Sequence, residues 1–180
     1  MSYEEKTMKS EKIYEGKILN LRIDTVELPD KKYSKREIIE HPGSVGIVPI
    51  TEDGYMILVE QFRKPVEKML LEIPAGKIEI NEEPKETAFR ELVEETGYTA
   101  KKMEYIFEFY TSPGFSDEKI YLFLATQLEL GQEKPMEDEY IEIKKVSIED
   151  LINMVNRGQI TDSKTIISIY FAEKYINQKR

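Results

Sequence analysis

Short stretches of alternating or continuous apolar residues recur along the chain, and most of them predict strands. Polar and apolar residues alternate from Lys12 to Leu28 until Pro29 interrupts the pattern, which indicates two short strands. The same reasoning predicts strands at Tyr33–Glu40, Val45–Ile50, Tyr55–Phe62, Met69–Ile73, Met103–Tyr110, Lys119–Leu128 and Tyr140–Val146. The turn sequence Thr51-Glu52-Asp53-Gly54 separates two of these stretches and is a strong hairpin signal.

Helical spacing marks three other segments. Ser147 suits the cap of a helix that runs to Arg157, and an apolar stripe predicts a last helix over Asp162–Ile176. A third helix begins at Pro84, which suits a first helical turn. Strands interleaved with helices predict an α/β fold in which a mixed sheet lies between helices, an α/β/α sandwich. We expect residues 1–42 to form an N-terminal antiparallel β extension and residues 43–180 to form the main domain.

The helix that begins at Pro84 has well-marked ends. Glu83 is expected at its cap with Glu86 three residues inside, a weak variant of a capping box. Gly97 suits the left-handed residue that ends a helix. The apolar residues expected to face the core are Ala88, Phe89, Leu92 and Val93.

The opposite side of this helix collects negative charge. The helical repeat places Glu91, Glu94 and Glu95 on one face, where like charges four residues apart destabilise a helix when left alone. A hard divalent cation with oxygen ligands would remove that cost. The alternative is a solvated acidic face.

Composition and charge narrow the class of protein. The chain of 180 residues has a net charge of −9, which disfavours binding to a nucleic-acid backbone. It contains no cysteine and a single histidine, His41, so thiolate and multi-histidine metal sites are excluded. No apolar run approaches a membrane span and no signal peptide is visible, so we expect a cytoplasmic protein.

The run from Gly76 to Tyr98 reads G-x5-E-x7-R-E-L-x-E-E-x-G-Y. It resembles the signature of the Nudix hydrolases, which cleave nucleoside diphosphates linked to another group. The fixed positions outside the acidic cluster are Gly76, Glu82, Arg90 and Gly97. For these the resemblance implies structural roles, and we expect Arg90 to brace the preceding loop through Glu82.

Two further stretches resemble the ADP-ribose pyrophosphatase branch of this family. They are Glu60–Arg63 followed by Leu71–Lys77, and the segment Ser112–Glu118. That branch carries a proline about sixteen residues past the signature, and Pro113 lies fifteen past Tyr98. A simple turn at Pro113-Gly114 is the alternative interpretation.

The resemblance implies a site for metal. The backbone carbonyl of Ala75 and the carboxylates of Glu91 and Glu95 would be ligands, with Glu94 shared between ions. The implied cofactor is Mg²⁺, with Mn²⁺ as the alternative ion.

The resemblance also implies contacts with substrate. Arg63 would contact a phosphate or the terminal ribose, and Glu118 would contact the ribose hydroxyls. Arg36 would lie near the adenine end, across a dimer interface. For each of the three, a surface salt bridge is the competing interpretation. The general base would be Glu137 or Glu139 on a late loop, with a solvated acidic loop as the alternative and Glu94 as the next candidate.

The implied activity is metal-dependent hydrolysis of ADP-ribose to AMP and ribose 5-phosphate. Another nucleoside diphosphate sugar or an oxidised nucleotide is the alternative substrate. A module that senses ADP-ribose without cleaving it is the alternative from a different class. The resemblance further implies a homodimer that exchanges its N-terminal strands.

Overall fold

The computed structural model of the chain describes residues 3–131 and 140–179. These residues form two compact units, and each is described by itself. The first unit contains residues 1–43 together with 109–120. The second unit contains residues 44–108 and 121–180.

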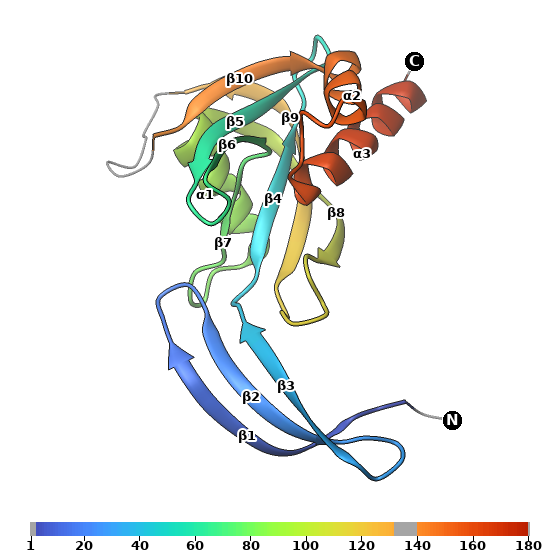
Figure 1. Cartoon of the computed structure of the whole chain (residues 1–180). Helices are drawn as coiled ribbons and strands as arrows, with labels where there is room; N and C mark the ends of the chain where they lie inside the picture. The colour runs from blue at the N-terminus through green and yellow to red at the C-terminus, as the bar shows by residue number, and fades with distance from the viewer. Residues whose placement is uncertain (1–2, 132–139, 180) are drawn as a thin grey trace. The chain divides into compact units, whose positions relative to one another are not determined.

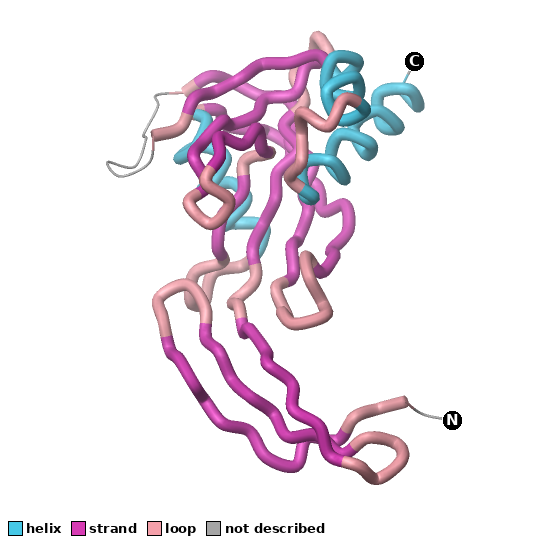
Figure 2. Tube along the Cα trace, in the orientation of Figure 1, coloured by secondary structure: helices cyan, strands magenta, loops and turns pink. Residues whose placement is uncertain are grey.

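The first unit is built on an antiparallel sheet in the order β1-β2-β3 (Figures 1 and 2). Its strands are β1 (Lys6–Glu15), β2 (Asn20–Glu27) and β3 (Tyr33–Glu40). The first strand begins earlier than the alternating pattern predicts, because the mainly polar segment Lys6–Lys12 pairs with β2 along the backbone, apart from Met8 at an irregularity in the register. Backbone pairing makes no demand on side-chain polarity, so the pattern does not reveal this part of the strand.

The segment 109–120 joins the first unit through the end of β3. The Ile39 amide donates to the Phe115 carbonyl at 2.8 Å, and the Asp117 amide donates to the Ile39 carbonyl at 3.1 Å. These two hydrogen bonds form a parallel bridge between Ile39 and Ser116. They attach the Ser112–Glu118 loop to a strand some seventy residues earlier in the sequence.

The second unit contains two further sheets. One has the order β10-β5-β6 and the other has the order β7-β4-β9-β8. Their strands are β4 (Ser44–Pro49), β5 (Tyr55–Arg63), β6 (Lys68–Glu72), β7 (Ala75–Lys77), β8 (Tyr98–Tyr110), β9 (Lys119–Leu130) and β10 (Glu142–Ser147). The last two residues of β8 and the first two of β9 belong to the first unit. The strand β4 is buried from Val45 to Pro49, as expected for a central strand that is covered on both faces.

The turn after β4 is present, but the hairpin that the sequence predicts is not. Gly54 adopts a φ of +81° and its amide donates to the Thr51 carbonyl at 3.0 Å, which closes the turn. Beyond it, β4 and β5 share one isolated bridge, between Ile50 and Met56, and then enter different sheets. Pro49 lacks a backbone N–H and the Ile50 amide donates to Ala125 of β9, so the ladder between β4 and β5 is not extended.

The helices are α1 (Pro84–Thr96), α2 (Ile148–Asn156) and α3 (Ser163–Lys179). In the second unit α1 lies on one side of the strands and α2 and α3 on the other, which gives the α/β/α sandwich expected from the sequence (Figure 1). Ala88 and Leu92 of α1 are buried in a core cluster with residues of three strands. The members from those strands are Val45, Ile47, Met103, Phe123 and Ala125.

One residue of the predicted core face is misplaced. Phe89 is exposed, and Thr87 takes a buried position on the core-facing side of α1. The Thr87 hydroxyl donates to the Glu83 carbonyl at 3.3 Å, which satisfies its polar group inside the helix. The apolar face of α1 is therefore rotated toward Thr87 relative to the expected one.

A search of the described residues finds no helix both long and apolar enough to cross a membrane.

Candidate active site

The helix α1, which carries the acidic cluster, begins and ends close to where the sequence predicts. Glu83 is its N-cap and Pro84 opens the first turn. Gly97 ends the helix with a φ of 69°, and its amide donates to the Val93 carbonyl. The predicted capping box is absent, because Glu83 makes no side-chain cap hydrogen bond. Caps of this kind use the shorter side chains of Ser, Thr, Asp and Asn.

Arg90 is the centre of an ion-pair network along α1. Its Nε and Nη2 donate to the two carboxylate oxygens of Glu82, each at 2.9 Å. Its Nη1 donates to Glu91 at 2.7 Å and to Glu94 at 3.0 Å. The guanidinium therefore braces the loop before the helix, as expected, and also compensates two members of the acidic cluster.

The network shifts the acidity of Glu82 and Arg90. The hydrogen bonds from Arg90 lower the pKa of Glu82 to about 2 from an ordinary value of 4.5. In return, the hydrogen bonds to Glu82 raise the pKa of Arg90 above its usual range. Both groups are therefore charged throughout the physiological pH range.

The segment between β6 and β7 brings backbone atoms against α1. The chain leaves one sheet at Glu72 and enters the other at Ala75. The Ala75 amide donates to a Glu95 carboxylate oxygen at 2.9 Å. A Cβ placed on Gly76 would lie 2.0 Å from the Glu91 carboxylate, so only glycine leaves room for this contact.

These contacts fit the predicted metal site in their chemistry. The carboxylates of Glu91 and Glu95 each lie against the Ala75–Gly76 backbone, and carboxylate oxygens suit a hard divalent cation. Across residues 3–131 and 140–179, no three acidic, histidine or cysteine side chains converge as they would around an ion. The donors are therefore held in separate pairs, Glu91 at Gly76 and Glu95 at Ala75.

Arg63, the predicted phosphate contact, lies at the end of β5 on a buried carboxylate. Its Nε and Nη2 donate to the two oxygens of Glu72 at 2.7 and 2.9 Å. Lys164 at the start of α3 also donates to Glu72. Glu72 belongs to the stretch Leu71–Lys77, but its partner Lys164 is 92 residues away and no local pattern signals it.

Arg36 and Glu118 belong to the first unit. Arg36 donates through Nε to Glu5 at 2.8 Å and through Nη1 to the Ser34 hydroxyl at 2.8 Å. Glu118 accepts from the Thr111 hydroxyl at 2.8 Å. Both side chains are thus engaged within their own unit, and their roles toward substrate stay predictions.

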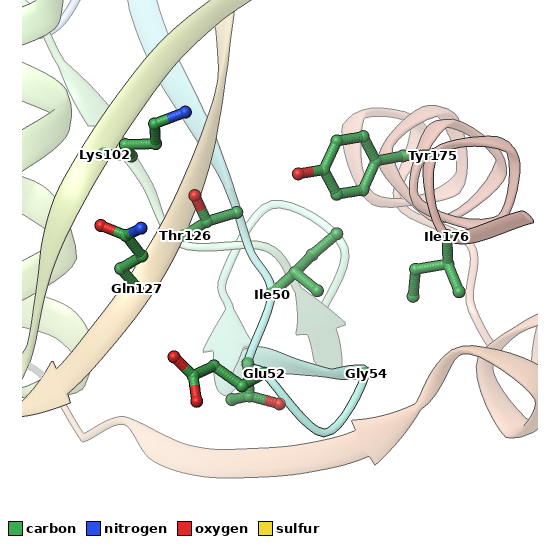
Figure 3. A pocket seen from close by; sticks show the side chains of 9 residues that line it. Ile50, Glu52, Gly54, Lys102, Thr126, Gln127, Tyr175 and Ile176 are labelled. Atoms are coloured by element: carbon green, nitrogen blue, oxygen red, sulfur yellow. The ribbon is translucent and has the colours of Figure 1, made fainter. Parts of the chain in front are cut away.

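The predicted bases Glu137 and Glu139 lie outside the described residues. A cavity of about 320 Å³ is present elsewhere in the second unit. Lys102, Thr126 and Gln127 line one side of it, and Tyr175 and Ile176 of α3 line the other (Figure 3). Among its described lining residues there is no member of the acidic cluster.

Comparison with known protein families identifies the class of this protein. Residues 40–167 match the NUDIX domain, and residues 5–39 match the nucleoside diphosphate sugar hydrolase N-terminal domain. Because the first match spans more than half of the chain, the protein belongs to the Nudix family and is a Nudix hydrolase.

Several curated proteins are similar over nearly the whole chain. An ADP-ribose pyrophosphatase of Bacillus subtilis (strain 168) is 49% identical, covering 96% of this chain and 94% of the relative. A methanol dehydrogenase activator of Bacillus methanolicus is 43% identical, covering 95% and 94%. A GDP-mannose pyrophosphatase of Yersinia pestis (strain Pestoides F) is 37% identical, covering 68% and 66%.

A solved structure described as an ADP compounds hydrolase has the same fold. It superimposes with a TM-score of 0.87 at 18% sequence identity, and the match covers 99% of this chain and 98% of the chain in that structure.

The low pKa of Glu82 predicts a pH-dependent stability. A carboxyl with a pKa of about 2 in the folded protein and about 4.5 in the unfolded chain stabilises the fold above pH 4.5. This contribution is lost as the pH falls from about 4.5 toward about 2. We expect Glu82→Gln to reduce the free energy of unfolding by about 1–2 kcal/mol at pH 6. The reduction should be smaller at pH 3 in urea titrations, and an equal reduction at both pH values would contradict this account.

Proposed function

We propose that this Nudix hydrolase is a cytoplasmic pyrophosphatase that cleaves ADP-ribose into AMP and ribose 5-phosphate. The observation that carries the proposal is the meeting of Glu91 and Glu95 with the Ala75–Gly76 backbone. The similarity to a pyrophosphatase of that name over 96% of the chain supports the choice of substrate. In this reaction water adds to one phosphorus atom and the bridging P–O bond breaks.

The cofactor in this proposal is Mg²⁺ or Mn²⁺, held by Glu91, Glu94, Glu95 and the Ala75 carbonyl. When bound, the ion would supply charge neutralisation of the diphosphate and acidification of a water molecule. Arg90 contributes by holding Glu91 and Glu94 in place through its Nη1. The hydrogen bond from the Ala75 amide orients the Glu95 carboxylate.

Three side chains outside the acidic cluster complete the proposed substrate site. Arg63 would bind a phosphate with the donors that now hold Glu72. Glu118 would accept hydrogen bonds from ribose hydroxyls, and Arg36 would lie near the adenine end. A net charge of −9 makes such local cations necessary for binding an anionic ligand.

The alternative within the same chemistry is another nucleoside diphosphate sugar. The GDP-mannose pyrophosphatase of Yersinia pestis favours it, although that similarity covers only 68% of this chain. A second function, activation of a dehydrogenase, is suggested by the name of the Bacillus methanolicus relative. Activation is compatible with hydrolysis, and adding the pure protein to a methanol dehydrogenase assay tests it separately.

A substrate panel tests the proposed activity. With Mg²⁺ present, we expect kcat/KM for ADP-ribose to exceed that for deoxynucleoside triphosphates by about 100-fold or more, because a site built around ribose hydroxyls rejects analogues that lack them. Release of AMP measured by chromatography provides the readout. Glu118→Ala should reduce this preference and leave metal-dependent hydrolysis in place. A higher value for GDP-mannose or for a triphosphate would reject ADP-ribose as the substrate.

The proposed metal site is tested by replacing a glutamate ligand with glutamine, which keeps the size of the side chain and removes its charge. Glu95→Gln should lower kcat by several orders of magnitude, about 4–6 kcal/mol of barrier, while the fold is retained. The matched control is Glu86→Gln in the first turn of the same helix, which should keep activity near the wild-type level. Full activity of the wild-type protein in excess EDTA would refute a metal requirement.

The general base is proposed to be Glu137 or Glu139. Replacing the base by glutamine should lower kcat far more than it raises KM, because the proton acceptor is needed only as the transition state forms. Steady-state kinetics of both single variants and of the double variant distinguish the two residues. Near-normal kcat in all three variants would move the base to Glu94.

We also propose that the protein is a homodimer that exchanges its N-terminal strands, residues 1–42, with Arg36 reaching the partner's site. In support, β1 is exposed at every residue and leaves apolar side chains uncovered. The exposed apolar side chains of β1 are Met8, Ile13 and Tyr14, and Tyr3 and Ile18 beside the strand are exposed as well. Light scattering should give a mass of about twice 21.1 kDa. A fully active monomer would reject both the dimer and the shared site.

A further inference from the structure

The carboxylate of Glu72 is buried and holds two cationic side chains. The residue is 1% exposed at the end of β6. Arg63 binds both carboxylate oxygens, and Lys164 donates to Oε2 from the start of α3. Burial by itself would raise the pKa of Glu72, but the hydrogen bonds from Arg63 and Lys164 outweigh it and lower the pKa. Glu72 is therefore an anion that needs a cation beside it at all times.

Lys164 is the enclosed partner of this anion. Its side chain is 12% exposed and also donates to Asp162 at 2.9 Å. Asp162 is fixed in turn by the buried Thr165, whose amide and hydroxyl donate to it at 3.0 and 2.6 Å. The Thr165 hydroxyl accepts from the Ile73 amide at 2.8 Å. Through Lys164 and Thr165, the start of α3 is therefore bound to Glu72 and Ile73, which precede Ala75 in the chain.

Arg63 is the partner of Glu72 that is accessible to solvent. Its side chain is 40% exposed, against 1% for Glu72. The hydrogen bond to Glu72 raises the pKa of Arg63 most, and the negative charge of Glu95 adds to the increase. Arg63 therefore lies within the electrostatic field of the acidic cluster while it is held on Glu72.

We infer that Lys164 is a positioning residue that allows Arg63 to exchange the buried Glu72 carboxylate for a phosphate of the substrate. This inference rests on the proposed function. Arg63 has the same planar pair of donors for either anion, since carboxylate and phosphate accept a guanidinium in similar geometry. The exchange needs a second cation, because Glu72 would otherwise lose its only compensating charge.

The arrangement of charges explains why Lys164 has this role. Arg63 and Lys164 balance Glu72 and Asp162, two cations against two anions. When Arg63 turns to the substrate, Lys164 remains with both carboxylates. Without Lys164, departure of Arg63 would leave two enclosed carboxylates with no cation in this network. Arg63 would then stay on Glu72 and bind substrate poorly.

Replacement of the lysine tests the exchange. Lys164→Met should raise the KM for ADP-ribose about tenfold, the scale of one charge-assisted hydrogen bond, and change kcat less than about threefold. Lys164→Arg keeps the charge and should recover most of the affinity. Lys144→Met is the matched control, since Lys144 pairs with Glu60 and Glu142 on β5 and β10, and its KM should be unchanged. An unchanged KM in Lys164→Met would overturn the inference.

Replacing the buried carboxylate of Glu72 should not weaken substrate binding, in contrast to Lys164→Met. This second variant keeps the inference testable if Lys164→Met does not fold. Glu72→Gln releases Arg63, so the affinity for ADP-ribose should be equal to or higher than that of the wild-type protein. Glu72→Gln combined with Lys164→Met should restore the affinity that Lys164→Met loses. A purely structural ion pair would give weaker binding in Glu72→Gln, and that result would overturn the inference even if Lys164→Met does not fold.

The test separates this inference from the proposed function. Hydrolysis of ADP-ribose by the wild-type protein decides the proposed function before any variant is made. Binding of α,β-methylene ADP-ribose, which is not hydrolysed, can be measured by calorimetry for the same variants. Equal affinities of this probe for wild-type protein and Lys164→Met would reject the exchange and leave the proposed activity intact.

Discussion

Glu91, Glu94 and Glu95 carry their negative charges on one face of α1, and each charge needs compensation if the helix is to fold before a cation binds. Arg90 supplies it for Glu91 and Glu94, and the Ala75 amide supplies a hydrogen bond for Glu95. The rest of the second unit follows from this requirement, because strands and loops must bring the Ala75–Gly76 backbone against the helix.

A second charge cluster secures that backbone from the other end. Glu72 precedes Ala75 by three residues and is anchored by Arg63 and Lys164. Between the two clusters the chain passes from one sheet to the other, so the Pro74 carbonyl can accept from Ile47 of β4 at 2.8 Å. A short segment fixed by charge at both ends keeps its position with little conformational freedom, which suits the proposed site for metal and phosphate.

Two relatives that are similar to this chain carry the names of different substrates. One is named for ADP-ribose and another for GDP-mannose, and the similarity to the second covers a smaller part of the chain. The signature on α1 is therefore suited to setting the chemistry of pyrophosphate cleavage. In the proposed function, residues outside the signature, such as Arg63, Arg36 and Glu118, would select the substrate.

The sequence by itself determined the features that arise from neighbouring residues. The ends of α1 at Pro84 and Gly97 and the cap of α2 at Ser147 follow from local backbone preferences, and the resemblance to Nudix hydrolases rests on a fixed local spacing. The tertiary structure decided the features that depend on distant partners. The separation of β4 and β5 into two sheets depends on β9, and the pairing of Glu72 with Lys164 joins residues 92 positions apart. Local periodicity carries no information on such contacts, because their energy comes from groups that only folding brings together.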